Sequence, residues 1–470
     1  MKALLVVPSQ ENVYGIKMSP IYPPLGVLYL AAMLEKHGHE VRFIDMDAEE
    51  CGPDALLAQV DVFRPGLVGF SCVTPTVTLG FDLAARIKKA HPETAVVMGG
   101  IHATIAPDAT MAAEGLDAIC IGESEHTVVE LVDALEGKRP MESVAGIQFK
   151  RDGVVVKNEP RPMEKDLDNF PFPAFHLVKD LTKYSPADAT SLPVAPIMTS
   201  RGCPGACTYC CTKQIFGRRF RGRSVENILE EVDILVNRFG IKELHFLDDN
   251  LSTNRKRILA LCAELKKRAY PIKYEIANGI RADMVDREIL LALRGIGMVN
   301  IGFGVESGNE EILKIIRKGI DKDTVRRVMA MAKELGFETW GFFIIGLYGE
   351  NAQTVQDTID FAIELDPDFA KFLILKPFPG SQIFDQLNAD GLIDSHDYSR
   401  YGVYTAPVHH LHDLTADEIL NWQKRAFRRF YFRPKKILRH LMRIRSWTQF
   451  KIVVKGGILV LSRIFQRKPR

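Results

Sequence analysis

The 470-residue sequence has no run of eighteen or more apolar residues, so it predicts no transmembrane helix. Its first apolar stretch is short and ends at Pro8, and we therefore expect no signal peptide. Cysteines are few, and four of them stand singly in apolar segments: Cys51, Cys72, Cys120 and Cys262. Because this pattern is not a disulfide framework, we expect a reducing, cytoplasmic compartment.

Acidic residues are absent from residues 421–470, which contain 16 lysines and arginines. The remainder has 45 basic against 59 acidic residues, so the net charge of +2 hides a basic extension on an acidic body. We expect residues 391–470 to form a basic helical extension, with a helix at 414–432. Because residues 421–470 are also apolar, we expect peripheral contact with the inner face of an anionic membrane and no nucleic acid partner. Docking of the extension on the acidic body is the alternative.

The dinucleotide fingerprint G-x-G-x-x-G is missing after the first expected strand, which argues against NAD or FAD. Residues 1–135 instead alternate short apolar runs with helical patterns. Strands are expected at Ala3–Val7, Val41–Asp45, Leu67–Cys72, Ala95–Gly99 and Ala118–Ile121. This rhythm predicts an α/β domain with a doubly wound, flavodoxin- or Rossmann-like parallel sheet. Ligands bind such sheets at the carboxyl ends of the strands.

Four of the eight cysteines gather in residues 199–211, TSRGCPGACTYCC. Cys203, Cys207 and Cys210 have the spacing C-x3-C-x2-C, and thiolates this close together can share one iron–sulfur cluster. Three ligands leave one iron of a four-iron cluster open to a small chelating molecule. Zinc is the alternative, but it takes four ligands, and no fourth Cys or His stands at zinc-finger spacing. Cys211 directly follows Cys210, so its side chain should point away from a shared metal.

This motif, with aromatic Tyr209 before its last cysteine, resembles the radical S-adenosylmethionine (radical SAM) enzymes. The resemblance implies that Cys203, Cys207 and Cys210 hold a [4Fe-4S] cluster whose open iron chelates SAM. It also implies that an electron from the cluster cleaves SAM and releases a 5'-deoxyadenosyl radical.

Residues 196–390 read as six strand–helix units and resemble the partial (β/α)6 barrel of that family. Strands are expected at 195–199, 243–247, 274–279, 299–305, 339–345 and 369–375. Polar residues follow several of them, where a barrel collects its reactive groups. By resemblance, SAM contacts are expected from Tyr209, Asp248, Asp249, Arg281, Glu306 and Ser307. Residues 376–381, KPFPGS, are expected on the substrate side.

The N-terminal domain resembles the cobalamin-binding domain that precedes many radical SAM barrels, through its turns GGIHAT and GESE. Cobalamin contacts are expected from Ser71, Thr74, Gly99, Gly100, His102, Gly122 and Glu123. The motif D-x-H-x-x-G is absent, so we expect cobalamin without a protein histidine on cobalt. A flavodoxin-like spacer without a cofactor is the alternative.

Three further segments carry weaker signals. Residues 136–195 are proline-rich and predict a stiff linker with one hairpin, 144–157, turning at Asp152-Gly153. The arginines after the cluster motif are expected on a solvated face, or as a basic rim for an anionic substrate or an electron donor: Arg218, Arg219, Arg221 and Arg223. Three histidines near the C-terminus favour ordinary loop contacts over a metal site: His409, His410 and His412.

Together these features predict a cobalamin-dependent radical SAM enzyme, most simply one that methylates an unactivated carbon. The basic, apolar extension favours a lipid or isoprenoid-like substrate, and a flavodoxin or ferredoxin would supply electrons. Ring formation, ring contraction or carbon–carbon coupling without methyl transfer is one alternative. A non-catalytic cobalamin sensor or cluster-bearing binding protein is another, although a sensor would not need the SAM residues.

Overall fold

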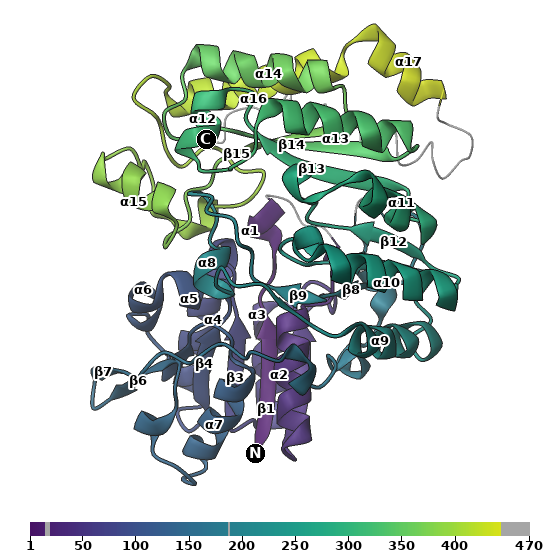
Figure 1. The fold of residues 1–470 in the computed structure, drawn as a ribbon. Helices are drawn as coiled ribbons and strands as arrows, with labels where there is room; N and C mark the ends of the chain where they lie inside the picture. The colour runs from purple at the N-terminus through teal and green to yellow at the C-terminus, as the bar shows by residue number, and fades with distance from the viewer. Residues whose placement is uncertain (15–18, 187–188, 443–470) are drawn as a thin grey trace.

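A computed structural model describes residues 1–14, 19–186 and 189–442, which form an N-terminal sheet domain and a larger strand–helix domain beside it (Figure 1). The N-terminal strands are β1 (Lys2–Val7), β2 (Glu40–Asp45), β3 (Leu67–Ser71), β4 (Ala95–Gly99), β5 (Ala118–Cys120), β6 (Ile147–Arg151) and β7 (Val154–Lys157). The helices are α1 (Glu11–Tyr14), α2 (Leu25–Lys36), α3 (Pro53–Phe63), α4 (Val77–Ala90), α5 (Ile101–Ile105), α6 (Pro107–Met111) and α7 (Glu125–Leu135).

The predicted doubly wound sheet is confirmed. Its strand order is β2-β1-β3-β4-β5-β6-β7, and the first five strands are parallel in the flavodoxin order. The predicted hairpin is also present, but it continues this sheet, because β6 pairs antiparallel with β5. Segment 136–195 is therefore only in part a linker.

The second domain repeats strand and helix six times. Its main strands are β8 (Val194–Ile197), β11 (Glu243–Phe246), β12 (Lys273–Ile276), β13 (Asn300–Glu306), β14 (Glu338–Ile345) and β15 (Phe369–Ile374), with a short ladder of β9 (Ser200–Arg201) and β10 (Arg221–Gly222). Its helices are α8 (Thr212–Ile215), α9 (Val225–Asn237), α10 (Arg255–Arg268), α11 (Arg287–Gly295), α12 (Glu310–Ile315), α13 (Lys322–Glu334), α14 (Ala352–Leu365) and α15 (Gln382–Ala389).

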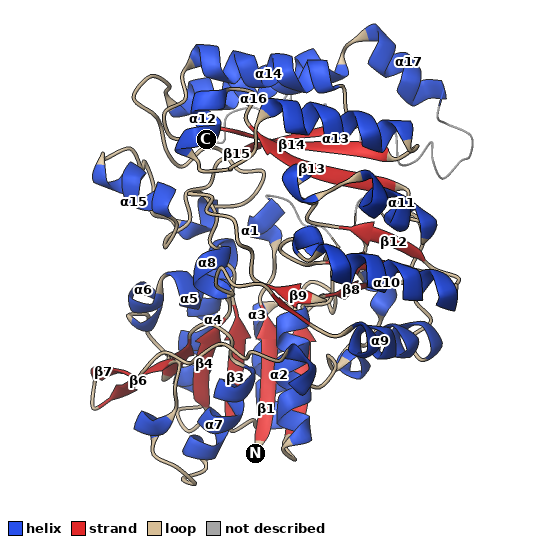
Figure 2. Ribbon diagram, viewed as in Figure 1, coloured by secondary structure: helices blue, strands red, loops and turns tan. Residues whose placement is uncertain are grey.

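These six strands lie within a few residues of their predicted positions, and all their pairings are parallel. They form two three-stranded sheets, β12-β11-β8 and β13-β14-β15, which meet at one bridge between Ile280 and Phe303. Figure 2 shows the helices packed along these strands. The carboxyl ends of the strands are therefore the place to look for a site.

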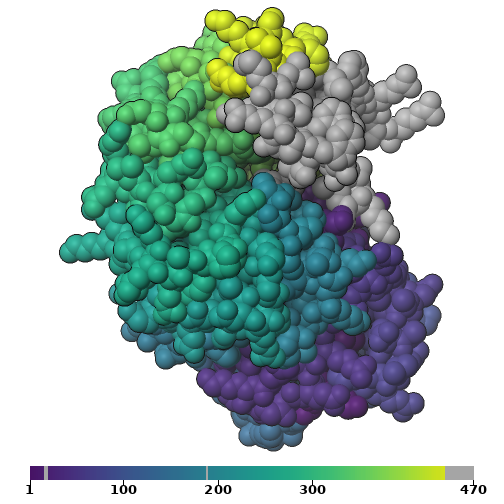
Figure 3. All heavy atoms as spheres, turned by 90° about the vertical axis from the view of Figure 1, so that its right-hand side faces the viewer, coloured from purple at the N-terminus to yellow at the C-terminus, as the bar shows by residue number. Residues whose placement is uncertain are grey.

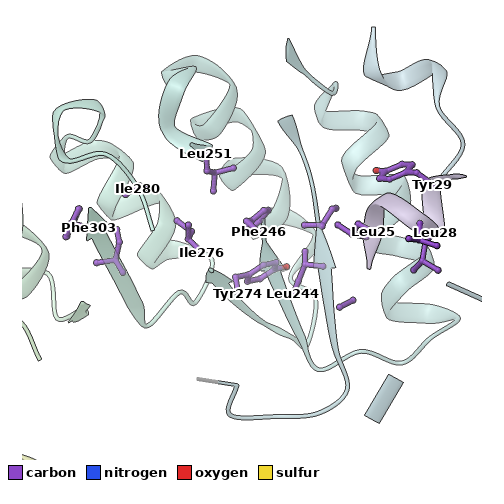
Figure 4. Close-up of a cluster of buried hydrophobic side chains, with 14 of the residues drawn as sticks. Leu25, Leu28, Tyr29, Leu244, Phe246, Leu251, Tyr274, Ile276, Ile280 and Phe303 are labelled. Atoms are coloured by element: carbon purple, nitrogen blue, oxygen red, sulfur yellow. The ribbon is translucent and has the colours of Figure 1, made fainter. Parts of the chain in front are cut away.

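One apolar core runs through both domains. Leu25, Leu28 and Tyr29 of α2 belong to the same buried cluster as Leu244 and Phe246 of β11 (Figure 4). A separate apolar cluster fills the other face of the N-terminal sheet, between β1, β3, β4 and the helices α3 and α4. The shared cluster fixes the two domains against each other, because separating them would expose its apolar surface to water.

The C-terminal segment packs on the strand–helix domain through α16 (Ala416–Tyr431), which confirms the helix predicted at 414–432, and continues into α17 (Pro434–Met442). Phe427 and Phe430 pack against Phe372 of β15. Figure 3 shows the last described residues, in yellow, at the end of the molecule away from the purple N-terminal domain. No helix in the described ranges is both long and apolar enough to span a membrane.

The basic residues at the start of this extension dock on an acidic residue of the body. Arg433, Lys436 and Arg439 all pair with Asp366, which ends α14. These three side chains therefore dock this part of the extension on the body, as the alternative expects, while contact with a membrane stays a prediction. The second apolar run of the sequence, within residues 443–470, lies outside the described residues.

Candidate active site

The three motif cysteines lie on a loop between β9 and α8, and all three are free thiols. A Cβ placed on Gly205 would lie 3.4 Å from the Cys203 Sγ and 3.8 Å from the Cys207 Sγ, so these two sulfur atoms face the same small space. The thiol of Cys211 instead points to the carbonyl oxygen of Pro379, at 3.7 Å. The loop thus separates its last two cysteines, as the sequence predicted.

A guanidinium lies beside the thiols. Arg281 Nη1 is 4.0 Å from the Cys207 Sγ, while its other nitrogens bond Asp283 and the carbonyl oxygen of Lys318. Burial raises the pKa of the Cys203 thiol, and the Gly205 backbone N–H and the Arg281 charge oppose that rise. Arg281 therefore favours the thiolate form that iron requires.

Tyr209 of the motif is half-buried beside an ion pair that the sequence did not reveal. Lys318 Nζ lies 2.6 Å from Glu306 Oε1 and 3.4 Å from the Tyr209 hydroxyl, and both charged side chains are nearly inaccessible. Glu306 ends β13 at a register shift and has φ 65°, a left-handed conformation that costs a residue with a Cβ about 1–3 kcal/mol. Such strain is typical of functional sites, and here it presents the Glu306 carboxylate to the cluster loop.

The two aspartates that follow β11 bind the cluster loop itself. Asp248 accepts hydrogen bonds from Thr199 and Ser200, including one of 2.7 Å from the Thr199 hydroxyl. Asp249 accepts from the Gly202 N–H at 2.9 Å and from the Thr212 hydroxyl at 3.3 Å. Both carboxylates therefore position the loop, and the structure shows them engaged there.

Two other predicted groups lie differently from the expectation. The Ser307 hydroxyl is fully buried; it lies 3.1 Å from the Thr358 hydroxyl of α14 and accepts from the backbone N–H of Asn309, the residue that caps α12. Arg221 and Arg223 are buried in ion pairs with Glu123 and Glu231, so the prediction of a solvated face is wrong for them. The tertiary fold places these carboxylates beside the two arginines, which are therefore buried as ion pairs. Arg218 and Arg219 are exposed, as predicted.

Six of the seven predicted cobalamin residues lie at the carboxyl edge of the N-terminal sheet: Ser71, Thr74, Gly99, Gly100, His102 and Gly122. His102 is fully buried, and its Nδ1 lies 3.2 Å from the Thr74 hydroxyl. Its Nε2 has no hydrogen-bond partner among the described residues, and Tyr398 packs edge-on against the ring. Gly122 has φ 76° with open space where a Cβ would stand, so this edge has room for a ligand.

The seventh predicted residue, Glu123, faces the other domain. Its carboxylate pairs with Arg201 at 3.1 Å and with Arg221 at 2.7 Å, and Arg201 also pairs with Glu125. Arg201 lies two residues before the first cluster cysteine and contacts the rings of Tyr29, Phe170 and Phe216. We call this set, Glu123, Glu125, Arg201 and Arg221, the interdomain ion network.

Three parts of the molecule meet at one junction. They are the loop with the motif cysteines (the cluster loop), the carboxyl edge of the N-terminal sheet (the cobalamin edge) and the loop after β15. Cys211 contacts Pro379, and Gln214 of α8 donates to the Gly380 carbonyl. A Cβ on Gly380 would lie 3.2 Å from the Ile105 carbonyl oxygen in α5, and α5 also packs against α8. The predicted substrate-side loop thus lies between the two predicted cofactor regions.

A strap formed by residues 398–406 crosses from this junction to the N-terminal domain. The Val403 N–H donates to the Val13 carbonyl at 2.7 Å, and buried Lys376 donates to the carbonyls of Thr405 and Ala406. Burial lowers the pKa of Lys376 to about 7. The sequence flagged residues 376–381 but gave no sign that the C-terminal segment covers them.

The three C-terminal histidines have separate partners, so within the described residues they form no shared metal site. His409 bonds the Gly346 carbonyl, His410 bonds Asp394, and His412 lies 3.5 Å from Asp390. The interpretation as ordinary loop contacts is supported.

Substitution Gly100→Ala is expected to lower the free energy of unfolding by about 1–3 kcal/mol. Gly100 has φ 91°, and a Cβ there would lie 2.8–2.9 Å from the backbone of Cys72. Gly122→Ala is the matched control, because it has a positive φ without a close neighbour. Thermal denaturation should show the larger loss for Gly100→Ala, and equal losses would contradict the close approach.

Substitution Glu350→Gln should flatten the dependence of stability on pH. Glu350 is buried and accepts from the N–H groups of Gly346 and Leu347, and burial raises its pKa to about 8. The folded state therefore keeps a proton that the unfolded state releases near pH 4–5, so stability falls by up to about 1.4 kcal/mol per pH unit as the pH rises from there to about 8. Denaturation midpoints of parent and variant between pH 5 and 8 measure the difference; parallel curves would refute it.

The donor groups present fit the cofactors that the motifs imply. Three free thiols on one loop, with Arg281 beside them, suit an iron–sulfur cluster with one open iron. The unpartnered Nε2 of His102 and the open space at Gly122 suit a ligand at the sheet edge. Both places adjoin the same junction, so groups bound there would share one reaction space.

Comparison with known proteins agrees with this arrangement. Residues 197–362 match the radical SAM superfamily and residues 11–132 match the B12 binding domain. An uncharacterized methyltransferase of Pyrococcus horikoshii is 33% identical, over 99% of both chains. The anaerobic magnesium-protoporphyrin IX monomethyl ester cyclase of Rubrivivax gelatinosus is 27% identical, over 92% of this chain and 77% of its own.

Among solved structures, the cobalamin-dependent S-adenosylmethionine radical enzyme OxsB, with aqua-cobalamin and SAM bound, shares the fold. Its TM-score is 0.76 at 19% identity, covering 99% of this chain and 72% of that one. The cofactors of the two matched families are a [4Fe-4S] cluster with SAM and cobalamin, respectively. The chain belongs to the B12-binding radical SAM enzyme family, whose members include methyltransferases and anaerobic magnesium-protoporphyrin cyclases.

Proposed function

We propose that this enzyme transfers a methyl group from cobalamin to an unactivated carbon of a hydrophobic substrate. The observation that carries the proposal is the junction of the cluster loop, α5 and the loop after β15. A methyl donor, a radical source and a substrate must lie within contact of one another for this reaction, and three surfaces meet there. We further propose that the six parallel strand–helix units form one open barrel around this space.

When bound, the cluster and SAM supply the hydrogen-abstracting radical and cobalamin supplies the methyl group. The chain's own groups hold and shield these cofactors. Arg281, beside the cluster thiols, would offer a guanidinium suited to the SAM carboxylate, and Glu306 would offer an acceptor for the SAM ammonium group. Segment 398–406 closes the space from the C-terminal side, which keeps water from a reactive radical.

The hydrophobic substrate and the membrane contact rest on the C-terminal extension. Phe432, Ile437 and Leu438 are each 44–57% exposed on a surface that also carries Lys435 and Arg428. Apolar and basic side chains together favour an anionic bilayer interface as the place where the substrate is met. If the full-length protein fails to sediment with anionic liposomes at low salt, the membrane part is wrong.

An acidic electron donor such as flavodoxin or ferredoxin is proposed to dock at Arg218 and Arg219. Both are exposed and follow the cluster loop, and Arg218 bonds the Pro204 carbonyl on that loop. Positive charge at this point would steer an anionic partner toward the cluster.

The decisive test of methyl transfer is anaerobic reconstitution with cluster, cobalamin, SAM and a reductant, followed by mass spectrometry. Methyl transfer predicts S-adenosylhomocysteine and 5'-deoxyadenosine in equal amounts. The second candidate, cyclisation or coupling without methyl transfer, is favoured by the cyclase relative and predicts 5'-deoxyadenosine alone. If neither product forms, the result would favour a non-catalytic cobalamin sensor.

A further inference from the structure

A second group of ligand-type side chains is buried away from the thiol loop. Glu243 and His245 lie on one face of β11, and Glu275 on β12 stands directly opposite His245 in the strand register. The alternate residues Leu244, Phe246, Tyr274 and Ile276 face the apolar cluster (Figure 4). Since strand side chains alternate, the three polar residues point to the opposite face, into the interior of the strand–helix domain.

The spacing of these three residues matches a metal coordination shell. His245 Nε2 lies 3.2 Å from Glu243 Oε2 and 3.6 Å from Glu275 Oε2. One candidate ligand atom from each residue lies within 4.8 Å of the other two. Ligands at about 2.1 Å from a tetrahedral Zn²⁺ stand roughly 3.4 Å apart, so the observed separations bracket the expected one.

Neighbouring groups already orient the would-be ligands. The Tyr22 hydroxyl lies 2.7 Å from His245 Nδ1, which leaves Nε2 as the nitrogen directed at the carboxylates. The other oxygen of Glu243 accepts from the Thr190 N–H at 2.8 Å and from its hydroxyl. Support of this kind, from groups behind the ligands, is characteristic of metal sites in proteins.

The charges at this place also favour a cation. Two carboxylates, each at most 11% exposed, face one fully buried imidazole. Lys273 lies 3.8 Å from Glu243 but is half exposed, so water screens its charge. A divalent ion would bind one oxygen of each carboxylate and the imidazole nitrogen at once.

We propose that Glu243, His245 and Glu275 bind a divalent transition-metal ion with mixed nitrogen and oxygen preference, such as Zn²⁺. The site is separate from the cluster cysteines and from the cobalamin edge. Through Tyr22, which lies between α1 and α2, it ties the N-terminal domain to β11 and β12. Its effect is structural, because it holds the two cofactor-binding domains in a fixed position relative to each other.

The test uses the full chain with Cys203, Cys207 and Cys210 all replaced by alanine, so that zinc cannot occupy the cluster loop. After dialysis against Zn²⁺ and then against metal-free buffer, elemental analysis should find about one zinc per chain, and a strong chelator should lower the thermal midpoint. Adding His245→Gln should remove this zinc and the chelator effect together. Adding Tyr22→Phe should weaken zinc affinity by about 10–100-fold, because the imidazole loses its orienting partner.

Tyr270→Phe is the matched control, since Tyr270 bonds Asp233 on the outer surface and should leave zinc affinity unchanged. If His245→Gln does not fold, Tyr22→Phe against Tyr270→Phe still decides the question. Zinc retained by folded His245→Gln, no stoichiometric zinc in the parent, or equal affinity in the two tyrosine variants would each overturn the site. In that case the three residues form a hydrogen-bonded ion cluster without metal.

Discussion

Substitution Cys203→Ala should reduce formation of 5'-deoxyadenosine by about 1000-fold or more, which corresponds to about 4 kcal/mol or more of lost barrier reduction. Cys203 shares one small space with Cys207, next to Arg281. With one of three ligands missing, the loop cannot hold four irons, and SAM has no open iron to chelate. The measurement is single-turnover product analysis under anaerobic conditions, together with the iron content of the purified protein.

Cys211→Ala provides the control for this result. Its thiol points to Pro379 and not to the other sulfur atoms, so iron content and SAM cleavage should stay within about twofold of the parent, equivalent to less than about 0.5 kcal/mol. If Cys203→Ala cleaved SAM at the parent rate, or if Cys211→Ala behaved like it, the ligand assignment would be wrong.

The second large effect is expected from Arg201→Ala. This guanidinium is buried between two domains and pairs with Glu123 and Glu125. Removing it takes away the arginine that pairs with Glu125 and one of the two arginines that pair with Glu123, and breaking a buried pair in this way costs about 3–5 kcal/mol. Denaturant unfolding should therefore show a large loss of stability in the transition that separates the domains.

Exposed Arg218, which bonds only one backbone carbonyl among the contacts described, supplies the control, and Arg218→Ala should change stability by less than about 0.5 kcal/mol. The conservative substitution Glu123→Gln tests whether the interdomain ion network positions the cobalamin edge relative to the cluster loop. We expect it to slow methyl transfer more than SAM cleavage, because the network fixes the cobalamin edge relative to the cluster loop. Equal slowing of both steps, or no loss of stability in Arg201→Ala, would show that the network does not set this distance.

Local spacing explains why the cluster loop could be predicted. Cys203, Cys207 and Cys210 lie within eight residues of one another, so their convergence depends on one loop. The positions of the strands could also be predicted, because apolar runs and helical patterns alternate along the chain. The hairpin β6–β7 was predicted as well, but its addition to the sheet edge depends on β5, which lies far from it in the sequence.

Pairings between distant residues explain what could not be predicted. From the sequence, Arg221 and Arg223 are expected on the surface, because the sequence does not show that Glu123 and Glu231 lie beside them. Asp248 follows a strand, as a ligand-binding residue would, but Thr199 and Ser200 engage its carboxylate. Nothing in the sequence was a reason to predict Lys318 as a site residue, because only the fold brings its ammonium group close to Glu306 and Tyr209.

The most direct measurement of the central claim is electron paramagnetic resonance of the reduced, reconstituted protein, with and without SAM labelled with ¹⁵N and ¹⁷O at its amino and carboxylate groups. Three cysteine ligands predict a [4Fe-4S] signal that shifts when SAM is added and shows hyperfine coupling to both labels. A signal that is indifferent to SAM, or a metal centre with all its coordination supplied by the protein, would contradict the account.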